Sequence, residues 1–263
     1  MNFRTLFVVS LCVYSAISSA QTPTEALFNA IRAQDVAEID RLLSVDPKLA
    51  STRNAGGHSA VMMALFLSVG EVIPSPEHNA PLQTLLKRRP PLTFFEACAT
   101  GDFNAVRAAL GRDTSLARAW DPIGLSALHF AAFSGNAATT QLLLDRGADL
   151  DGRARNAFRN TPLQVALLAG NEATARLLLD RGADPLVRQK RGFAPIHEAA
   201  LLGRRDLVDL LLDKGADINS RGDDGRNAVT EALRGGYPDL AEYLRTKGAK
   251  EVAITADLSK PPQ

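Results

Sequence analysis

Cysteine is nearly absent from this chain, which has 2 cysteines among 263 residues. Cys12 lies in an apolar N-terminal segment, so removal of that segment on export would leave Cys98 alone and no disulfide could form within the chain. An excess of charge of one sign is also lacking, because 30 Lys and Arg residues face 29 Asp and Glu residues. Nucleic-acid binding needs a net basic surface, so we expect no nucleic-acid partner.

Long apolar runs are lacking except for one near the N-terminus. Arg4 precedes the almost entirely apolar stretch 6–17, and residues 18–20 (Ser-Ser-Ala) form a small-residue cleavage site. The run is too short to span a bilayer with these flanks. This pattern is typical of a signal peptide over residues 1–20, and it is similar to those of Gram-negative bacteria. We expect cleavage after Ala20, no transmembrane segment in the mature chain and a periplasmic location, with secretion as the alternative.

Groups that could support catalysis or bind a metal are scarce. The four histidines show no metal-ligand spacing, Cys98 has no activating base near it in the sequence, and the glycines do not form a phosphate-binding loop. Three glutamates recur at one position of the repeat described below, which favours a row along the fold over an acid/base pair. We therefore expect no catalytic residue, no metal site, no cofactor and no enzymatic activity. The glutamates are Glu96, Glu198 and Glu231.

What the chain does contain is an internal repeat. Between about residues 124 and 249, four copies follow one another at a spacing of 33 to 35 residues. A period of this length is typical of stacked supersecondary units, none of which can bury its apolar face alone. The equivalent alanines are Ala131, Ala166, Ala199 and Ala232, and the glycines four positions later are Gly135, Gly170, Gly203 and Gly236.

The repeat resembles the ankyrin family. The family's T-P-L-H-x-A signature matches SALH at 126–129, TPL at 161–163 and APIH at 194–197. The resemblance implies a turn, two antiparallel helices and a hairpin-like loop to the next unit. The residues themselves indicate the same shape, because the small residues Ala199, Ala200 and Gly203 predict a slim first helix. The leucine-rich stretch 207–212 predicts a second helix with a wide apolar face.

Degraded copies of the repeat extend toward the N-terminus. We expect an all-α ankyrin-repeat solenoid of about seven helix-turn-helix units over residues 21–249, irregular over 21–120 and regular over 121–249, followed by a flexible tail at 250–263. The connectors VDPKLASTRNAGGHSA and RDTSLARAWDPIGLSA have the same design. Prolines and a glycine at 68–79 interrupt one unit between its helices. Such an inserted loop can lie on a binding face, or it can be a tolerated surface insertion without a role.

The resemblance also gives single residues a place in the fold. His129 and His197 occupy the family's structural histidine position, where the ring hydrogen-bonds neighbouring loops. In ankyrin stacks, the residues before the recurring glycine and the connector tips line the concave surface. Here these positions carry large apolar groups, and an exposed apolar patch indicates an interaction site; alternatively, some of these side chains pack against adjacent loops. The predicted partner-binding residues are Ile123, Leu125, Phe133, Phe158, Leu168, Arg188, Arg191, Phe193 and Leu201.

The sequence thus predicts a monomeric, non-enzymatic scaffold that binds an unidentified partner protein through its concave surface in the bacterial envelope. A rim of arginines and a lysine around that surface either favours an acidic partner or simply solvates the loops. Two other functions remain open. One is a secreted effector that acts on host proteins. The other is a ligand-binding or enzymatic site built on the 68–79 loop, which would need groups such as His58, Glu77 and His78 to converge.

Overall fold

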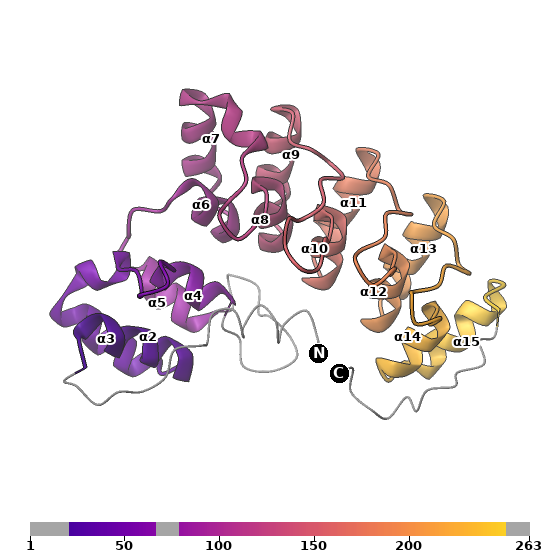
Figure 1. Ribbon diagram of the computed structural model, residues 1–263, viewed down its shortest axis with the longest axis horizontal. Helices are drawn as coiled ribbons and strands as arrows, with labels where there is room; N and C mark the ends of the chain where they lie inside the picture. Colours follow the sequence, from indigo (N-terminus) through magenta and orange to yellow (C-terminus); the bar gives the residue numbers. More distant parts are fainter. Residues whose placement is uncertain (1–20, 67–78, 251–263) are drawn as a thin grey trace. The chain divides into compact units, whose positions relative to one another are not determined.

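The computed structural model describes residues 21–66 and 79–250. Within these residues, fourteen α-helices come as seven consecutive pairs along the chain, with no strand among them (Figure 1). The predicted all-α repeat fold is confirmed. The predicted signal peptide, most of the predicted insertion loop (including Glu77 and His78) and the tail beyond Lys250 lie outside the described residues. The chain divides into two compact units after Thr100.

The first compact unit contains the irregular N-terminal repeats. In this unit α2 packs against α3 and α4, and α3 packs against α5. Thr22 and Glu25 form a reciprocal cap at the start of α2, because Thr22 Oγ1 accepts from Glu25 N at 3.2 Å and Glu25 Oε2 accepts from Thr22 N at 2.9 Å. The elements are α2 (Pro23–Ala33), α3 (Val36–Val45), η1 (Pro47–Ser51), α4 (Ala60–Phe66), α5 (Ala80–Leu86) and α6 (Phe94–Thr100).

The second compact unit begins at Gly101 and contains the end of the irregular region, 101–120, and the regular repeats. The first helices α8, α10, α12 and α14 pack side by side in one layer, and the second helices α7, α9, α11 and α13 pack in sequence in another (Figure 1). The elements are α7 (Phe103–Arg112), η3 (Thr114–Arg118), α8 (Ala127–Ser134), α9 (Ala137–Asp145), α10 (Pro162–Leu168), α11 (Glu172–Asp180), α12 (Pro195–Leu201), α13 (Arg205–Asp213), α14 (Ala228–Arg234) and α15 (Pro238–Thr246).

Small residues let the first helices approach one another closely. The four recurring alanines are all fully buried, as a slim first helix requires. The apolar face of the second helix is narrower than predicted. In α13, Leu207, Val208 and Leu211 are buried, whereas Leu210 and Leu212 remain partly exposed. The core therefore lies mainly between the first helices and the inner face of the second helices.

The two connectors that share a sequence design also share a structure. Each begins with a 3-10 helix capped by an aspartate: Asp46 Oδ1 accepts from Lys48 N at 3.0 Å, and Asp113 Oδ1 accepts from Ser115 N at 2.9 Å. Each connector then closes with one isolated antiparallel bridge, Arg53 to Ser59 in the first and Trp120 to Ser126 in the second. The similarity that the sequence predicts is confirmed.

Candidate functional site

The connectors that precede α8, α10, α12 and α14 lie next to one another along the second compact unit (Figure 1). We call residues 119–126, 148–161, 183–194 and 216–227 the connector row. One backbone hydrogen bond joins the tips of neighbouring connectors at each junction, so each tip is held at a fixed position beside the next. These bonds run from Arg155 N to Gly124 O (2.8 Å), from Lys190 N to Phe158 O (2.9 Å) and from Asp223 N to Arg191 O (2.9 Å).

Buried polar side chains tie the first helices to the row. His129 Nε2 lies 2.9 Å from Asn160 O in the next connector, and burial lowers the pKa of the ring to about 4, so the imidazole is neutral near pH 7. The structural role predicted for His129 is confirmed. Gln164 occupies the equivalent position one repeat later, and its Nε2 donates to Phe193 O at 3.0 Å. His197, the next equivalent residue, accepts from the Ala194 N–H through Nδ1 at 3.1 Å.

Three of the predicted partner-binding residues belong to the core. Leu125, Phe133 and Phe193 are only 6%, 9% and 7% exposed, so the expectation that they form an exposed apolar patch is wrong. The other four apolar residues of the prediction are half-buried, and the two predicted arginines are exposed. The half-buried residues are Ile123, Phe158, Leu168 and Leu201, and the exposed ones are Arg188 and Arg191.

The next connector covers the ring of Phe193. The centroids of the Phe193 and His197 rings are 5.1 Å apart, in an edge-on arrangement. A Cβ on Gly222 would lie 2.4 Å from the Phe193 ring, so the following connector can close over the ring only because this residue is glycine. The guanidinium carbons of Arg226 and Arg191 lie 5.2 and 5.6 Å from the centroid of the same ring. Phe193 therefore supports the row from within, with little of its side chain exposed.

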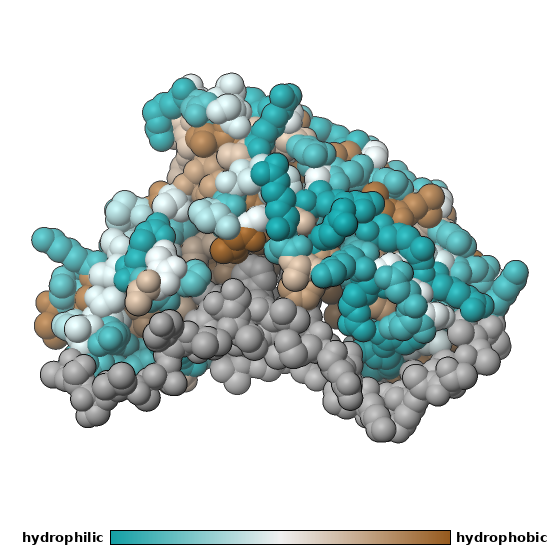
Figure 2. All heavy atoms as spheres, in the orientation of Figure 1, coloured by the Kyte–Doolittle hydropathy of each residue, from teal (hydrophilic) through white to brown (hydrophobic). Residues whose placement is uncertain are grey.

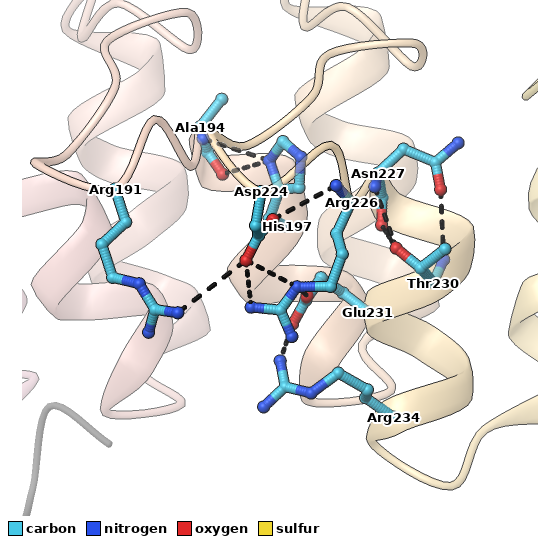
Figure 3. A network of polar contacts seen from close by, with 9 residues as sticks. All are labelled: Arg191, Ala194, His197, Asp224, Arg226, Asn227, Thr230, Glu231 and Arg234. Carbon is cyan, nitrogen blue, oxygen red and sulfur yellow. Dashed lines mark hydrogen bonds and ion pairs between the residues drawn. The ribbon is translucent and has the colours of Figure 1, made fainter. Parts of the chain in front are cut away.

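Arginines and acids form a network that includes the two arginines over this ring, Arg191 and Arg226 (Figure 3). Asp224 lies between Arg226, at 2.7 Å, and Arg191, at 3.8 Å. Arg226 continues to the buried carboxylate of Glu231 at 3.2 Å, and Arg234 contacts the other oxygen of that carboxylate. The network holds the last two connectors of the row against α14.

The predicted row of glutamates is buried. Glu96 accepts hydrogen bonds from the Ser59 hydroxyl and from Thr93 N, the latter at 2.6 Å. Glu198 accepts a long bond, 3.4 Å, from Gln164 Nε2, while its Oε2 has no partner at normal hydrogen-bond geometry among the described residues. Burial, with a contribution from the charge of Glu231, raises the pKa of Glu198 to about 8. This carboxyl is therefore largely protonated at neutral pH.

The sequence reasoning missed the most exposed apolar side chain of the row, Leu186, which is 50% exposed. Leu186 lies in a shallow, open hollow of about 460 Å³ that is also lined by Arg153, Arg188 and Lys190. A comparison of the repeats could have found it, because the same position carries the polar residues Asp151 and Asn219 in the adjacent repeats. A second missed contact stacks the Arg155 guanidinium on the Trp120 ring, 4.1 Å from its centroid.

The remaining candidate groups have ordinary structural surroundings. Cys98 is fully buried, and burial raises the pKa of its thiol to about 12. His58 is half-buried, and burial lowers its pKa. Across residues 21–66 and 79–250, no three His, Cys, Asp or Glu side chains gather so that they could hold a metal ion. In the same part of the chain, no helix is long and apolar enough to cross a bilayer.

Comparison with protein families agrees with this geometry. Residues 94–189 match a model of ankyrin repeats in three copies, and residues 196–245 match a second model of ankyrin repeats in many copies. Together the two models cover more than half of the chain. The chain belongs to the ankyrin-repeat family. Ankyrin-repeat proteins are generally non-enzymatic interaction modules, and neither model indicates an enzyme.

Two curated relatives are much longer than the segment that each of them shares with this chain. A transient receptor potential cation channel subfamily A member 1 homolog from Caenorhabditis elegans is 49% identical over 69 residues, which are 26% of this chain and 6% of that protein. The E3 ubiquitin-protein ligase XB3 from Oryza sativa subsp. japonica is 43% identical over 75 residues, which are 27% of this chain and 16% of the ligase. The likeness is therefore confined to a small part of each relative.

Proposed function

We propose that this ankyrin-repeat protein is a non-enzymatic scaffold that binds a partner protein through the connector row and the adjoining ends of its first helices. The observation that carries the proposal is the fixed arrangement of the connector row. Its tips are fixed by one backbone bond per junction, and it presents exposed cations together with the half-exposed side chain of Leu186. A preformed surface of this kind loses little conformational entropy when it binds. Since a fold does not name a partner, the row is the part of the molecule to test.

The experiment for this proposal is affinity capture with the full, tagged chain from native envelope extract, read by mass spectrometry. We expect a specific protein to be retained by the wild type and lost by the double variant Arg188→Glu/Arg191→Glu. The matched control Arg176→Glu/Arg181→Glu makes the same change of charge on α11 and at its C-cap, next to the row but outside it. Circular dichroism checks that all the chains keep their helicity. Equal retention by both variants and the wild type would show that the row is not the binding surface.

We further propose that the scaffold works in the bacterial periplasm, reached through the signal-like residues 1–20. The support is the order of a basic residue, an apolar stretch and a small-residue site in that segment. Expression with a C-terminal tag in a Gram-negative cell should place the chain in the periplasmic fraction, and N-terminal sequencing should start at Gln21. Recovery from the medium would favour the secreted alternative, and an uncleaved chain in the cytoplasm would contradict export.

A further inference from the structure

Several cations on or next to the second helices pair with acids, whereas most of those on the two middle connectors of the row, 148–161 and 183–194, do not. Arg176 of α11 pairs with Glu172 at 2.7 Å. The C-cap residues of α11 and α13, Arg181 and Lys214, pair with Asp145 and Asp180, each at 2.8 Å. Two adjacent connectors carry six exposed cations, and among the described residues only one of the six makes an ion pair, at a distance of 3.8 Å. The six are Arg153, Arg155, Arg159, Arg188, Lys190 and Arg191.

The local sequence concentrates this charge. Residues 153–159 and 186–193 contain all six cations and no acid, although the whole chain is nearly neutral. Two of the cations are held in place by the fold, because Arg155 stacks on Trp120 and Arg188 Nε donates to Gly192 O at 2.7 Å. A group of like charges on adjacent connectors, two of them held in place, creates a local positive potential that attracts an anionic group and orients it. Figure 2 shows hydrophilic residues gathered over the part of the second unit where these connectors lie.

Arg159 adds an observation that points to a ligand. Its backbone is left-handed, with φ at 58°. The other three connectors of the row have glycine at the equivalent position, and φ is 83° at Gly124, 74° at Gly192 and 80° at Gly225. A side chain in this conformation destabilises the fold relative to glycine. The chain therefore retains a cation at this tip at the expense of stability, as residues at binding sites often do.

The residues that line the hollow indicate which chemical class of ligand the row can bind. Leu186 offers apolar surface beside Arg153, Arg188 and Lys190, and an apolar contact next to cations suits a peptide better than a phosphate backbone. Asp184 and Asp223 also line the hollow, and their carboxylates repel a ligand with continuous negative charge. The combination selects a ligand in which separate carboxylates flank an apolar side chain.

We propose that residues 153–159 and 186–193 bind a short acidic segment of a partner protein. One apolar side chain of that segment contacts Leu186, and the carboxylates beside it pair with Arg153, Arg188 and Lys190. This inference rests on the proposed scaffold function, and it adds the chemical class of the partner's binding segment.

The test measures fluorescence anisotropy of a labelled peptide in which glutamates flank a single leucine, titrated with the full chain. We expect binding that weakens as salt is raised, about tenfold weaker binding after Arg153→Glu/Arg188→Glu/Lys190→Glu, and weaker binding after Leu186→Ser. Arg159→Gly should raise the Tm and still weaken binding, which a purely structural role would not produce. The matched control is Arg176→Glu/Arg181→Glu/Lys214→Glu, with the same change of charge on α11 and at the C-caps of α11 and α13.

Three outcomes would overturn the inference. They are an absence of peptide binding, an equal loss of binding in the helix control, and binding of an oligonucleotide of equal charge that is as tight as that of the peptide. Because the capture experiment uses the native partner and no designed peptide, a partner that is lost only from the row variant would leave the scaffold function standing in each case.

Discussion

Gly192→Ala should destabilise the fold by about 2–3 kcal/mol. Gly192 has a left-handed backbone with φ at 74°, where any side chain is strained. Its added Cβ would lie 2.9 Å from the backbone nitrogen of Asp223 and 2.2 Å from Oδ1 of the same residue. That nitrogen donates the tip bond to Arg191 O, so the methyl group strains the residue and also pushes apart two neighbouring connectors. Urea denaturation of the two chains gives the difference in free energy of unfolding.

Gly225 is the matched control, because it lies at the equivalent position one repeat later. Its φ is 80°, and a Cβ built there meets nothing within 4 Å. Gly225→Ala should therefore lower the free energy of unfolding only through the strained backbone, by about 1–2 kcal/mol. Equal losses at the two positions would mean that the contact between connector tips does not stabilise the array.

Glu198→Gln should stabilise the protein above about pH 8, by about 1–3 kcal/mol. The pKa of Glu198 is raised to about 8 by burial, whereas the ordinary value of a glutamate is 4.5. Between these values the unfolded chain has lost the proton that the folded chain keeps. Wild-type stability therefore falls as pH rises through this window, and it no longer changes on this account above the folded pKa. Glutamine has no proton to lose, so the variant lacks this dependence.

Denaturation midpoints measured from about pH 4 to 9 test this expectation, and the informative quantity is the difference between variant and wild type. That difference should be smallest at the acid end and should grow in favour of Glu198→Gln as pH rises. Glu242→Gln serves as control, since the Glu242 side chain is 70% exposed on α15 and should give a difference without this trend. A difference for Glu198→Gln that stays constant across the range would place the carboxylate in a solvated site, against its burial.

The sequence allowed the fold to be predicted because the repeat is governed by local requirements. Each of these requirements fixes one residue type at a regular spacing in the sequence. They are a buried alanine where two helices approach, a glycine where a helix ends and a polar residue at the start of α8 or α10. The same spacing also allowed the weaker N-terminal copies of the repeat to be predicted. Gln34 has φ at 55° at the position where later repeats have glycine, so the backbone keeps the repeat conformation after the signature residue is lost.

The exposure of the candidate site could not be predicted in the same way. Whether Phe193 faces solvent depends on the following connector, where Gly222 leaves room for its ring, and the family position of Phe193 alone does not contain that information. Leu186 was missed for the opposite reason. It departs from the polar residues at its equivalent positions, and a search for conforming residues passes over it. The two arginines were found because long charged side chains at connector tips reach solvent whatever their neighbours are.

The single backbone bond at each junction of the row has a consequence for the length of what it can recognise. Among the described residues, the backbone bonds of the row join each tip only to the tips beside it, so small displacements add up from one junction to the next. For a ligand that bridges two adjacent connectors, the spacing between them is set by one bond. For a ligand that contacts all four connectors, the spacing varies by the summed displacements at three junctions. Short segments can thus be read with precise spacing, and a longer partner has to be flexible enough to follow the row.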